Sequence, residues 1–346
     1  MEKKKVLVAM SGGVDSSAAA VRLMDMGYSC SGAIMKLYCG EDSTADAVED
    51  ARGVAEKLGM DFSAIDAQAQ FKEAVMDEFV ASYLRGETPN PCIVCNKKLK
   101  FGLFADYALE MGMDYIATGH YARVGKCGDR YVIKKGVDER KDQSYVLYNL
   151  SQQVLSRLLL PLGELSKAEV RALAAEAGLA VADKKESQDI CFVPDGDYAG
   201  FIEKNTDEIP EGDFVLSDGK IMGRHKGIVR YTIGQHKKLG LGIHTPLYVL
   251  EKNAAENKII LGSNEDLFKT TVYARDVNWM ACEAPAEPLK IKAKIRYKHT
   301  EQPATVYVTG EGVVRVEFDE PQRAVTPGQS VVFYDGDVLV GGGVIV

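Results

Sequence analysis

The segment Ser11-Gly12-Gly13-Val14-Asp15-Ser16 constrains the fold of this chain more than any other feature. A short apolar run rich in valine, residues 5–10, precedes it, and residues 16–26 carry alanine, valine, leucine and methionine at helical spacing. This pattern predicts a strand, a tight glycine turn and a helix. Backbone N–H groups of such a turn converge with the helix N-terminus on one anion-sized space, so the segment predicts a phosphate site.

Strands and helices are expected to alternate through the first 200 or so residues. Further strands are predicted at Cys30 to Leu37 and Tyr115 to Thr118, and further helices at Ala45 to Leu58, Gln70 to Leu84, Phe101 to Met111 and Lys167 to Ala177. This alternation predicts an α/β fold with a parallel sheet that is covered on both faces.

After about Phe201 the sequence changes to short runs of valine, isoleucine and tyrosine separated by glycine, proline and aspartate. Strands are predicted at Thr305 to Val308, Val313 to Phe318, Ser330 to Tyr334 and Val338 to Val346, with a hairpin turn at Asp335-Gly336. The C-terminal third is therefore predicted to form a small β-barrel. A glycine-rich stretch, residues 212–262, suggests a small module between the two parts.

The net charge of −8 argues against a protein that coats nucleic acid by bulk attraction, so any RNA site must be a local patch. One candidate is a basic series that alternates with apolar residues: Lys290, Lys292, Lys294, Arg296 and Lys298. On one strand these charges would line a single face and suit a phosphate backbone, although a solvated face of an amphipathic strand would show the same pattern.

The location of the chain is expected to be the cytoplasm. The apolar run near the N-terminus is far too short for the core of a signal peptide, and no segment resembles a membrane span. Seven cysteines, an odd number scattered over the chain, do not suggest a disulfide framework, and a reducing compartment would keep them as thiols.

Three of the cysteines lie in segments that suggest chemistry. Cys92 and Cys95 follow two prolines and precede Lys97, Lys98 and Lys100, whose positive charge is expected to favour thiolate. Cys191 lies in a polar stretch, Glu186 to Phe192, after the last predicted helix. The other four, Cys30, Cys39, Cys127 and Cys282, have no such surroundings and are interpreted as buried or incidental.

The residues alone leave three hypotheses open for Cys92, Cys95 and Cys191. Cys92 and Cys95 could form half of a zinc site, but no second Cys-x2-Cys or paired histidines follow. All three could be ligands of an iron-sulfur cluster with one open position. Alternatively, one cysteine could carry a persulfide and another thiolate could resolve it as a disulfide.

The phosphate loop lacks the lysine of the Gly-x4-Gly-Lys-Ser/Thr pattern and also differs from the dinucleotide Gly-x-Gly-x-x-Gly pattern. It resembles instead the Ser-Gly-Gly-x-Asp-Ser signature of the PP-loop ATP pyrophosphatases. That resemblance implies an enzyme that adenylates a carbonyl oxygen, with the loop on the leaving pyrophosphate and Asp15 as a candidate Mg²⁺ ligand.

Over nearly its full length the chain resembles the bacterial tRNA-specific 2-thiouridylases. The matching motifs are residues 11–16, Thr88 to Pro91, Cys95-Asn96, Thr118 to Tyr121, Lys141 to Tyr145, Glu186 to Phe192, Tyr231 to Gln235, Arg296-Tyr297 and Pro327 to Gln329. The resemblance implies an adenine nucleotide α-hydrolase-like (PP-loop) ATP-binding catalytic domain at residues 1–203. A small central domain would follow at 204–266 and a tRNA-contacting β-barrel at 267–346.

Site residues follow from this resemblance position by position. Cys95 would be the nucleophile and Cys191 the persulfide carrier. The residues implied to contact ATP are Ala9, Met10, Ser11, Gly12, Gly13, Val14, Asp15, Ser16, Met35 and Gly119. Those implied to face the target base are Asn90, Pro91 and Cys92, and those implied to touch tRNA are His120, Lys141, Asp142, Gln143, Arg296, Tyr297 and Gln329.

The reaction implied by the resemblance is ATP-dependent 2-thiolation of the wobble uridine of tRNAs for lysine, glutamate and glutamine. ATP and Mg²⁺ would be needed, AMP and pyrophosphate would be released, and the uridine would flip out of the anticodon stem-loop. A cysteine desulfurase or a sulfur relay protein would supply the persulfide.

The chain departs from the family pattern at two places. Many members have aspartate where this chain has Cys92, and His236-Lys237-Lys238 stands where arginine, lysine and glycine are expected. Two rival functions are a PP-loop ligase that acts on a small molecule and a non-catalytic RNA- or metal-binding protein. The barrel and the paired thiols would be superfluous to the first, and the phosphate loop would be unexplained in the second.

Overall fold

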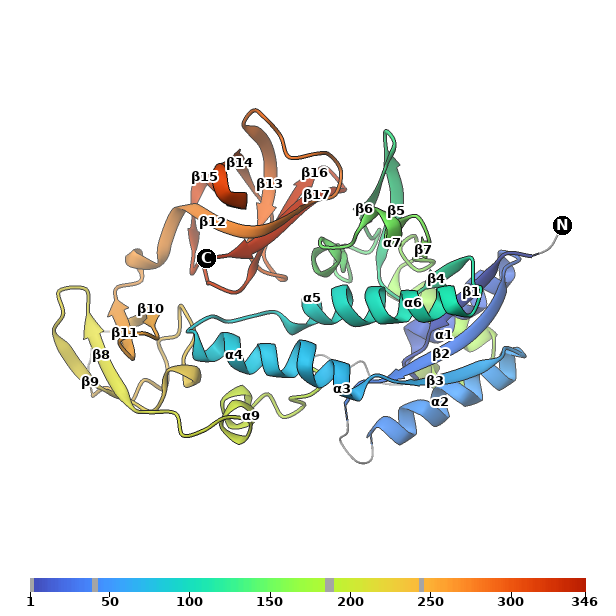
Figure 1. Cartoon of the computed structure of the whole chain (residues 1–346), viewed down its shortest axis with the longest axis horizontal. Helices are drawn as coiled ribbons and strands as arrows, with labels where there is room; N and C mark the ends of the chain where they lie inside the picture. Colours follow the sequence, from blue (N-terminus) through green and yellow to red (C-terminus); the bar gives the residue numbers. More distant parts are fainter. Residues whose placement is uncertain (1–2, 39–42, 184–189, 243–245) are drawn as a thin grey trace.

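The computed structural model describes residues 3–38, 43–183, 190–242 and 246–346. Figure 1 shows an α/β layer that contains the N-terminus, a small β module at the opposite end, and a β-barrel above that module. None of the described helices is long and apolar enough to cross a membrane.

The α/β layer is built on five parallel strands in the order β3-β2-β1-β4-β7. They are β1 (Lys5–Ala9), β2 (Ser29–Lys36), β3 (Phe62–Asp66), β4 (Tyr115–Ala117) and β7 (Leu158–Leu159). The predicted parallel sheet is therefore confirmed, together with the position of the glycine turn at the carboxyl end of β1.

Alternation along β1 explains how both faces of this sheet are covered. Val6 and Val8 belong to one core cluster and Leu7 to another, because successive side chains of a strand point to opposite faces. The first cluster includes residues of α1 (Val14–Asp25), α2 (Ser43–Leu58) and α8 (Lys167–Glu176). The second includes residues of α6 (Phe104–Glu110) and α7 (Gln152–Leu155).

Two long helical segments run side by side across the middle of the molecule in Figure 1. The first consists of α3 (Gln68–Phe71), a π-helical part η1 (Lys72–Asp77) and α4 (Glu78–Leu84); the second consists of α5 (Pro91–Cys95), a π-helical part η2 (Asn96–Leu103) and α6. The second helix begins ten residues before the predicted start at Phe101. Asn90 caps it by accepting a hydrogen bond from Cys92 N at 3.2 Å, and Pro91 occupies its first position.

The C-terminal part is a closed six-stranded barrel, as predicted from the sequence. Its strands are β12 (Phe268–Trp279), β13 (Leu289–Lys294), β14 (Gln302–Val308), β15 (Val314–Arg323), β16 (Ser330–Asp335) and β17 (Val338–Ile345), and β12 pairs with β17 to close it. Gly336, at the predicted hairpin turn, has a φ of 59°, a conformation that favours glycine.

An unexpected hairpin, β5 (Ala122–Cys127) and β6 (Arg130–Lys135), extends the sheet of the barrel from within the first 203 residues. Lys134 of β6 pairs with Val338 of β17. The core cluster behind it contains Met280, Val332 and Leu339 of the barrel together with α6 residues of the α/β layer. The α/β layer and the barrel therefore share one core, and the predicted division at residues 203 and 266 stays a prediction.

The small middle module has four strands in the order β10-β11-β8-β9, preceded by helix α9 (Tyr198–Lys204). Its strands are β8 (Gly212–Leu216), β9 (Ile221–His225), β10 (Tyr248–Asn253) and β11 (Lys258–Gly262). Short 3-10 turns complete the description: η3 (Ser144–Leu147), η4 (Ala180–Asp183), η5 (Ile228–Arg230), η6 (Glu265–Leu267) and η7 (Gly310–Gly312).

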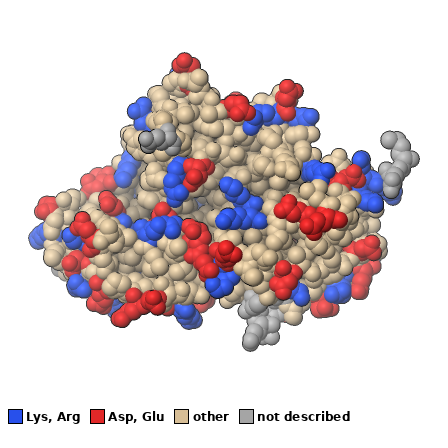
Figure 2. Space-filling view, viewed as in Figure 1, with Lys and Arg blue, Asp and Glu red and all other residues tan. Residues whose placement is uncertain are grey.

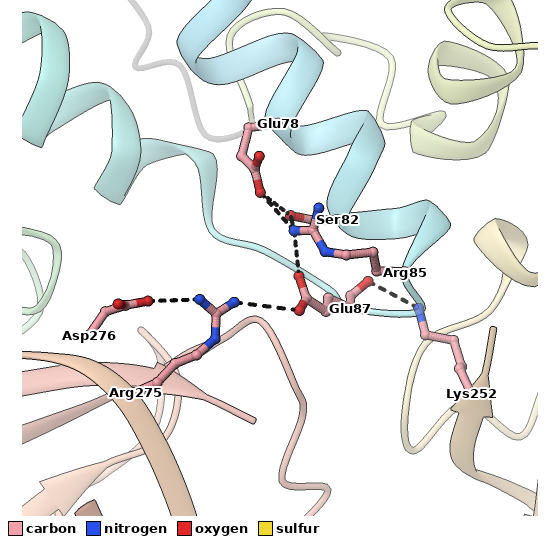
Figure 3. A network of polar contacts seen from close by, with 7 residues as sticks. All are labelled: Glu78, Ser82, Arg85, Glu87, Lys252, Arg275 and Asp276. Atoms are coloured by element: carbon pink, nitrogen blue, oxygen red, sulfur yellow. Dashed lines mark hydrogen bonds and ion pairs between the residues drawn. The ribbon is translucent and has the colours of Figure 1, made fainter. Parts of the chain in front are cut away.

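The α/β layer, the middle module and the barrel meet at residues 86–90, which lead into α5, the helix that contains Cys92 and Cys95. Glu87 is the centre of the network in Figure 3: its carboxylate is 2.9 Å from Arg85 and 3.7 Å from Arg275 of β12, and its carbonyl accepts a hydrogen bond from Lys252 of β10 at 3.2 Å. The next residue, Thr88, donates its N–H to Pro327 O at 2.8 Å. Middle module and barrel therefore both hold the segment that positions Cys92 and Cys95.

Candidate active site

The phosphate loop presents an uncapped helix N-terminus. Gly13 is the N-cap residue of α1 and no side chain caps this helix, so Ser16 is not its N-cap. Ser16 Oγ instead accepts the N–H of Ser11 at 3.1 Å and closes the loop on itself. Gly12 has a φ of 68°, and a Cβ there would lie 2.7 Å from Ala47 O. The N–H groups of the first helical turn are thus left for an anion.

Asp15 is held by two partners at the mouth of this loop. Its Oδ1 lies 2.7 Å from Lys167 Nζ and accepts a hydrogen bond from Tyr121 OH, also at 2.7 Å. Among the described residues, no group of three or more His, Cys, Asp or Glu side chains is arranged to hold a metal ion. A Mg²⁺ ion at Asp15 would have to share the carboxylate with Lys167, and its role as a metal ligand stays a prediction.

A cavity of about 430 Å³ opens beside the loop, within the range of roughly 300–1,000 Å³ that is usual for small-molecule sites. Its lining contains many of the residues that the resemblance assigned to ATP: Ala9, Met10, Ser11, Asp15, Ser16, Met35 and Gly119. Gly12, Gly13 and Val14 shape the loop behind them. The same lining includes Cys191, Lys100, His120 and Gln143. The fold therefore joins the phosphate loop and one of the two cysteines in a single cavity.

The three cysteines of interest lie close enough to influence one another. Cys95 is buried at the end of α5, whereas Cys92, one helical turn earlier, is exposed. Cys191 is also an exposed residue, but the walls of the cavity remove much of the water around it. This desolvation raises the pKa of Cys191 to about 11, and the neighbouring Cys95 and Cys92 contribute in the same direction.

The expectation that local lysines favour thiolate is met only in part at Cys95. Burial raises the pKa of Cys95, and this effect outweighs the opposite effect of Lys100. Lys97 and Lys98 are exposed, and neither is among the charges that act on the thiol. Both Cys95 and Cys191 are thus protonated at neutral pH unless a further cation or ligand acts on them.

The metal hypotheses gain no support from the described residues. Cys92, Cys95 and Cys191 all lie within them, yet they do not form a metal-holding group of three. Cys30 has its pKa raised to about 11 by burial, in keeping with its interpretation as incidental. Cys39 and the motif residues 186–189 lie outside the described part of the chain.

His120 is buried in the floor of the cavity. Its Nδ1 is 2.7 Å from Thr118 Oγ1, and its ring centroid is 5.7 Å from that of Phe101. Burial lowers the pKa of His120 to about 3, and the positive charge of Lys100 adds to the effect. His120 is therefore neutral at physiological pH, and its contact with tRNA stays a prediction.

Acid should destabilise the wild-type protein more steeply than a His120→Gln variant as the pH falls from 6.5 to about 3. In that window the unfolded chain takes up a proton on this histidine and the folded chain does not. The stabilisation from the neutral ring is complete above 6.5 and is lost as the pH falls towards 3. Urea midpoints measured at several pH values test this. The exposed His236→Gln variant should keep the wild-type slope, and equal slopes for wild type and His120→Gln would contradict the prediction.

Several residues that the resemblance assigned to tRNA lie together on the barrel side of the site. Tyr297 donates its hydroxyl to Asp142 O at 3.2 Å, and Cys92 is one of the groups that act on Tyr297 electrostatically. The Asp142 carboxylate accepts N–H groups of Gly136 and Ser144 at 3.0 and 3.1 Å, so it also orders its own loop. Figure 2 shows Lys and Arg side chains, with Asp and Glu side chains among them, near the hollow in the middle of the face in view.

The remaining assigned residues make contacts within the protein. Gln143 Oε1 accepts the N–H of Tyr121 at 2.8 Å. Gln329 Nε2 donates to Thr88 O at 2.7 Å and thereby ties the barrel to the segment before Asn90. Arg296 Nη1 is 3.5 Å from Arg323 O, and Lys141 N donates to Asp138 O at 2.9 Å. Their roles toward tRNA stay predictions.

The basic series is shorter than the sequence suggested. β13 ends at Lys294, so only Lys290, Lys292 and Lys294 alternate on one strand. Lys294 is half-buried, and burial lowers its pKa while the nearby Asp142 and Glu301 act in the opposite direction. The expectation that all five charges line one strand is therefore wrong, and two acidic groups from other segments, Asp142 and Glu301, act on Lys294.

Lys167 is a site residue that sequence reasoning missed. It follows Ser166, which forms a capping box with Glu169 at the start of α8. The Ser-x-x-Glu pattern does predict a helix N-terminus. It contains no signal that this helix lies against the phosphate loop 152 residues away.

Comparisons with known proteins place the chain in a class. A family model described as "tRNA methyl transferase HUP domain" matches residues 4–195, a "tRNA methyl transferase PRC-barrel domain" matches 199–263 and an "Aminomethyltransferase beta-barrel domain" matches 269–345. The fold and the site thus define a three-part enzyme with a HUP-type nucleotide domain and two β modules.

Close relatives identify the family within this class. The chain is 49% identical to the "tRNA-specific 2-thiouridylase MnmA" of Clostridioides difficile, with 99% of this chain and 98% of the relative covered. It is 48% identical to the protein of the same name from Acetivibrio thermocellus, over 100% of both chains. The chain belongs to the tRNA-specific 2-thiouridylase family.

Proposed function

We propose that this protein is a tRNA-uridine 2-sulfurtransferase, which uses ATP to replace the 2-oxygen of a wobble uridine by sulfur. The observation that carries this proposal is the shared cavity. It has a phosphate loop on one side and Cys191 on the other, and Cys95 lies near enough to act on Cys191 electrostatically. A nucleotide-activated carbonyl and a sulfur carrier would meet in such a cavity.

ATP would bind with its phosphates on the uncapped N-terminus of α1 and its base against the apolar part of the lining, which includes Ile34, Met35 and Leu37. Uridine is activated when its 2-oxygen attacks the α-phosphorus and pyrophosphate leaves. The N–H groups of the loop then stabilise the charge on the departing pyrophosphate. Lys167 pairs with Asp15 of the same loop, so its charge would compensate part of the charge of phosphates bound there.

Sulfur transfer would follow in two displacements. The terminal sulfur of a Cys191 persulfide attacks carbon 2, and the C–O bond breaks as AMP leaves. The Cys95 thiolate then attacks Cys191 Sγ, the persulfide S–S bond breaks, and its electron pair stays on the sulfur of the uridine. The two thiols are oxidised to a disulfide and the transferred sulfur is reduced. A dithiol reductant reopens the disulfide before the next turnover.

The surface proposed to bind tRNA lies on the barrel and on the segments that contact it. Lys and Arg side chains lie near the hollow of the face in Figure 2, with Asp and Glu side chains among them. Tyr297 contacts Asp142 and is within electrostatic reach of Cys92. We infer that the anticodon stem-loop of tRNAs for lysine, glutamate and glutamine binds there, in the cytoplasm. The persulfide would come from a cysteine desulfurase or a sulfur relay protein.

Loss of the gene should remove 2-thiouridine derivatives from bulk tRNA, as measured by nucleoside mass spectrometry. A plasmid copy of the wild-type gene should restore them, and a Cys191→Ser copy should not. The purified protein should also release pyrophosphate from ATP only when tRNA is added. If 2-thiouridine persisted without the gene, or if a small carboxylic acid replaced tRNA in the ATP reaction, the proposed function would be wrong.

A further inference from the structure

Among the described residues, one lysine lies close both to the phosphate loop and to the reactive cysteines. Lys100 lies in the π-helical part η2, five residues after Cys95, and lines the same cavity as Ser11, Ser16 and Cys191. It is half-buried, whereas Lys97 and Lys98 on the same helix are exposed. π-helical turns shift side chains relative to a regular helix and are frequent at functional sites.

In the part of the chain that the structure describes, no acidic side chain pairs with Lys100. Within the described ranges, its ammonium takes part in no hydrogen bond and no ion pair. It acts instead on three groups from three different segments: Cys95 in α5, Cys191 beyond α8, and His120 after β4. A cation that lines a cavity without a carboxylate partner stabilises negative groups that come close to it. Such a charge is usually retained where a negative group arrives during function.

We propose that Lys100 is the residue that stabilises the sulfur anions of Cys191 and Cys95 while sulfur is transferred. The role rests on the proposed function, since it assigns Lys100 to that reaction. Lys100 lines the cavity in which the anions form, and it is the cation common to both thiols. Cys92 is the other ionisable group that acts on both of them, and it disfavours their ionisation.

Both displacements of the reaction need this charge. In the first, the attacking atom is the persulfide anion on Cys191, and its negative charge passes to the departing AMP. In the second, the attacking atom is the Cys95 thiolate, and the charge passes to the sulfur on uridine. Burial opposes each anion, so without Lys100 the reactive fraction of each sulfur would fall at neutral pH. Lys100 neither gives nor takes a proton in these steps.

Alkylation of Cys191 by iodoacetamide tests the inference without ATP or tRNA. The rate at each cysteine is followed by peptide mass spectrometry, with the exposed Cys127 as a reference in the same sample. Lys100→Met keeps the length of the side chain and removes the charge. It should slow alkylation of Cys191 about tenfold at pH 8, the equivalent of one pKa unit. Cys127 should react at the wild-type rate.

Two matched variants separate charge from structure. Lys98→Met changes an exposed lysine on the same helix and should leave the alkylation rate at Cys191 unchanged. Lys100→Arg keeps the positive charge and should retain most of the wild-type alkylation rate. Thermal melting checks that each variant is folded. A rate at Cys191 in Lys100→Met within about twofold of wild type would overturn the inference. Alkylation does not require thiolation, so this result is independent of whether the proposed function holds.

The pH profile of the reaction gives a second readout. In single turnovers with persulfide-loaded enzyme, the pH of half-maximal sulfur transfer should rise by about one unit in Lys100→Met. A residue that only supported the helix would lower the rate equally at every pH. An unchanged profile would therefore also overturn the inference.

Discussion

Replacing Cys191 by serine should abolish sulfur transfer to tRNA and leave the adenylation of tRNA intact. Serine cannot carry a persulfide, so the first displacement has no attacking sulfur. Cys191 lies in the cavity lining beside the phosphate loop, but the loop and the N-terminus of α1 are built from residues far from it in sequence. We therefore expect 2-thiouridine formation to fall at least about 1,000-fold, the scale seen when a catalytic nucleophile is removed.

The two activities are measured separately. Pyrophosphate release in the presence of tRNA reports adenylation, and nucleoside mass spectrometry of the same tRNA reports thiolation. Cys127→Ser, an exposed cysteine in the β5–β6 hairpin, is the matched control and should keep both activities. Full thiolation by Cys191→Ser would exclude Cys191 from the scheme, and a loss of pyrophosphate release would place it in the ATP site instead.

Replacing Gly119 by alanine should impair ATP activation about 100-fold in kcat/KM. A Cβ at Gly119 would lie 2.8 Å from Asp15 C and 2.9 Å from Ser16 N, both backbone atoms of the phosphate loop. The loop would have to move, and displacements of about 1 Å in a reacting group can cost about 100-fold. Gly119 thus matters for the closeness of two backbones as well as for any contact with the nucleotide.

Gly53→Ala is the matched control for this change. Gly53 lies in α2, where an added Cβ would meet nothing within 4 Å, so activity should be unchanged and stability equal or higher. The KM for ATP and the rate of pyrophosphate release are measured for both variants, together with thermal melting. If Gly119→Ala retained wild-type kinetics, the loop would not depend on this close approach.

Features formed by residues adjacent in the chain could be predicted from the sequence. The phosphate loop lies between adjacent elements, so its strand, turn and helix could be inferred from residues 5–26, and the barrel followed from short alternating runs. The start of α5 at Pro91 was missed, although Asn90 and Pro91 are a typical N-cap and first position.

Contacts between distant segments could not be predicted from spacing. The ion pair of Lys167 with Asp15 and the place of Lys100 in the cavity depend on how helices pack on the sheet. The raised pKa of Cys95 has the same origin, because sequence shows the neighbouring lysines but not the burial that outweighs them. Only the family resemblance implied that Cys191 lies close to the phosphate loop.

The shared core of the α/β layer and the barrel limits how this enzyme can be engineered or can diverge. A foreign barrel grafted after residue 266 would have to reproduce the apolar surface formed by Met280, Val332 and Leu339. It would also need an edge strand for β6 and a partner for Thr88. Because Thr88 leads directly into the helix of Cys92 and Cys95, exchange of the barrel between relatives would also affect the position of these two cysteines.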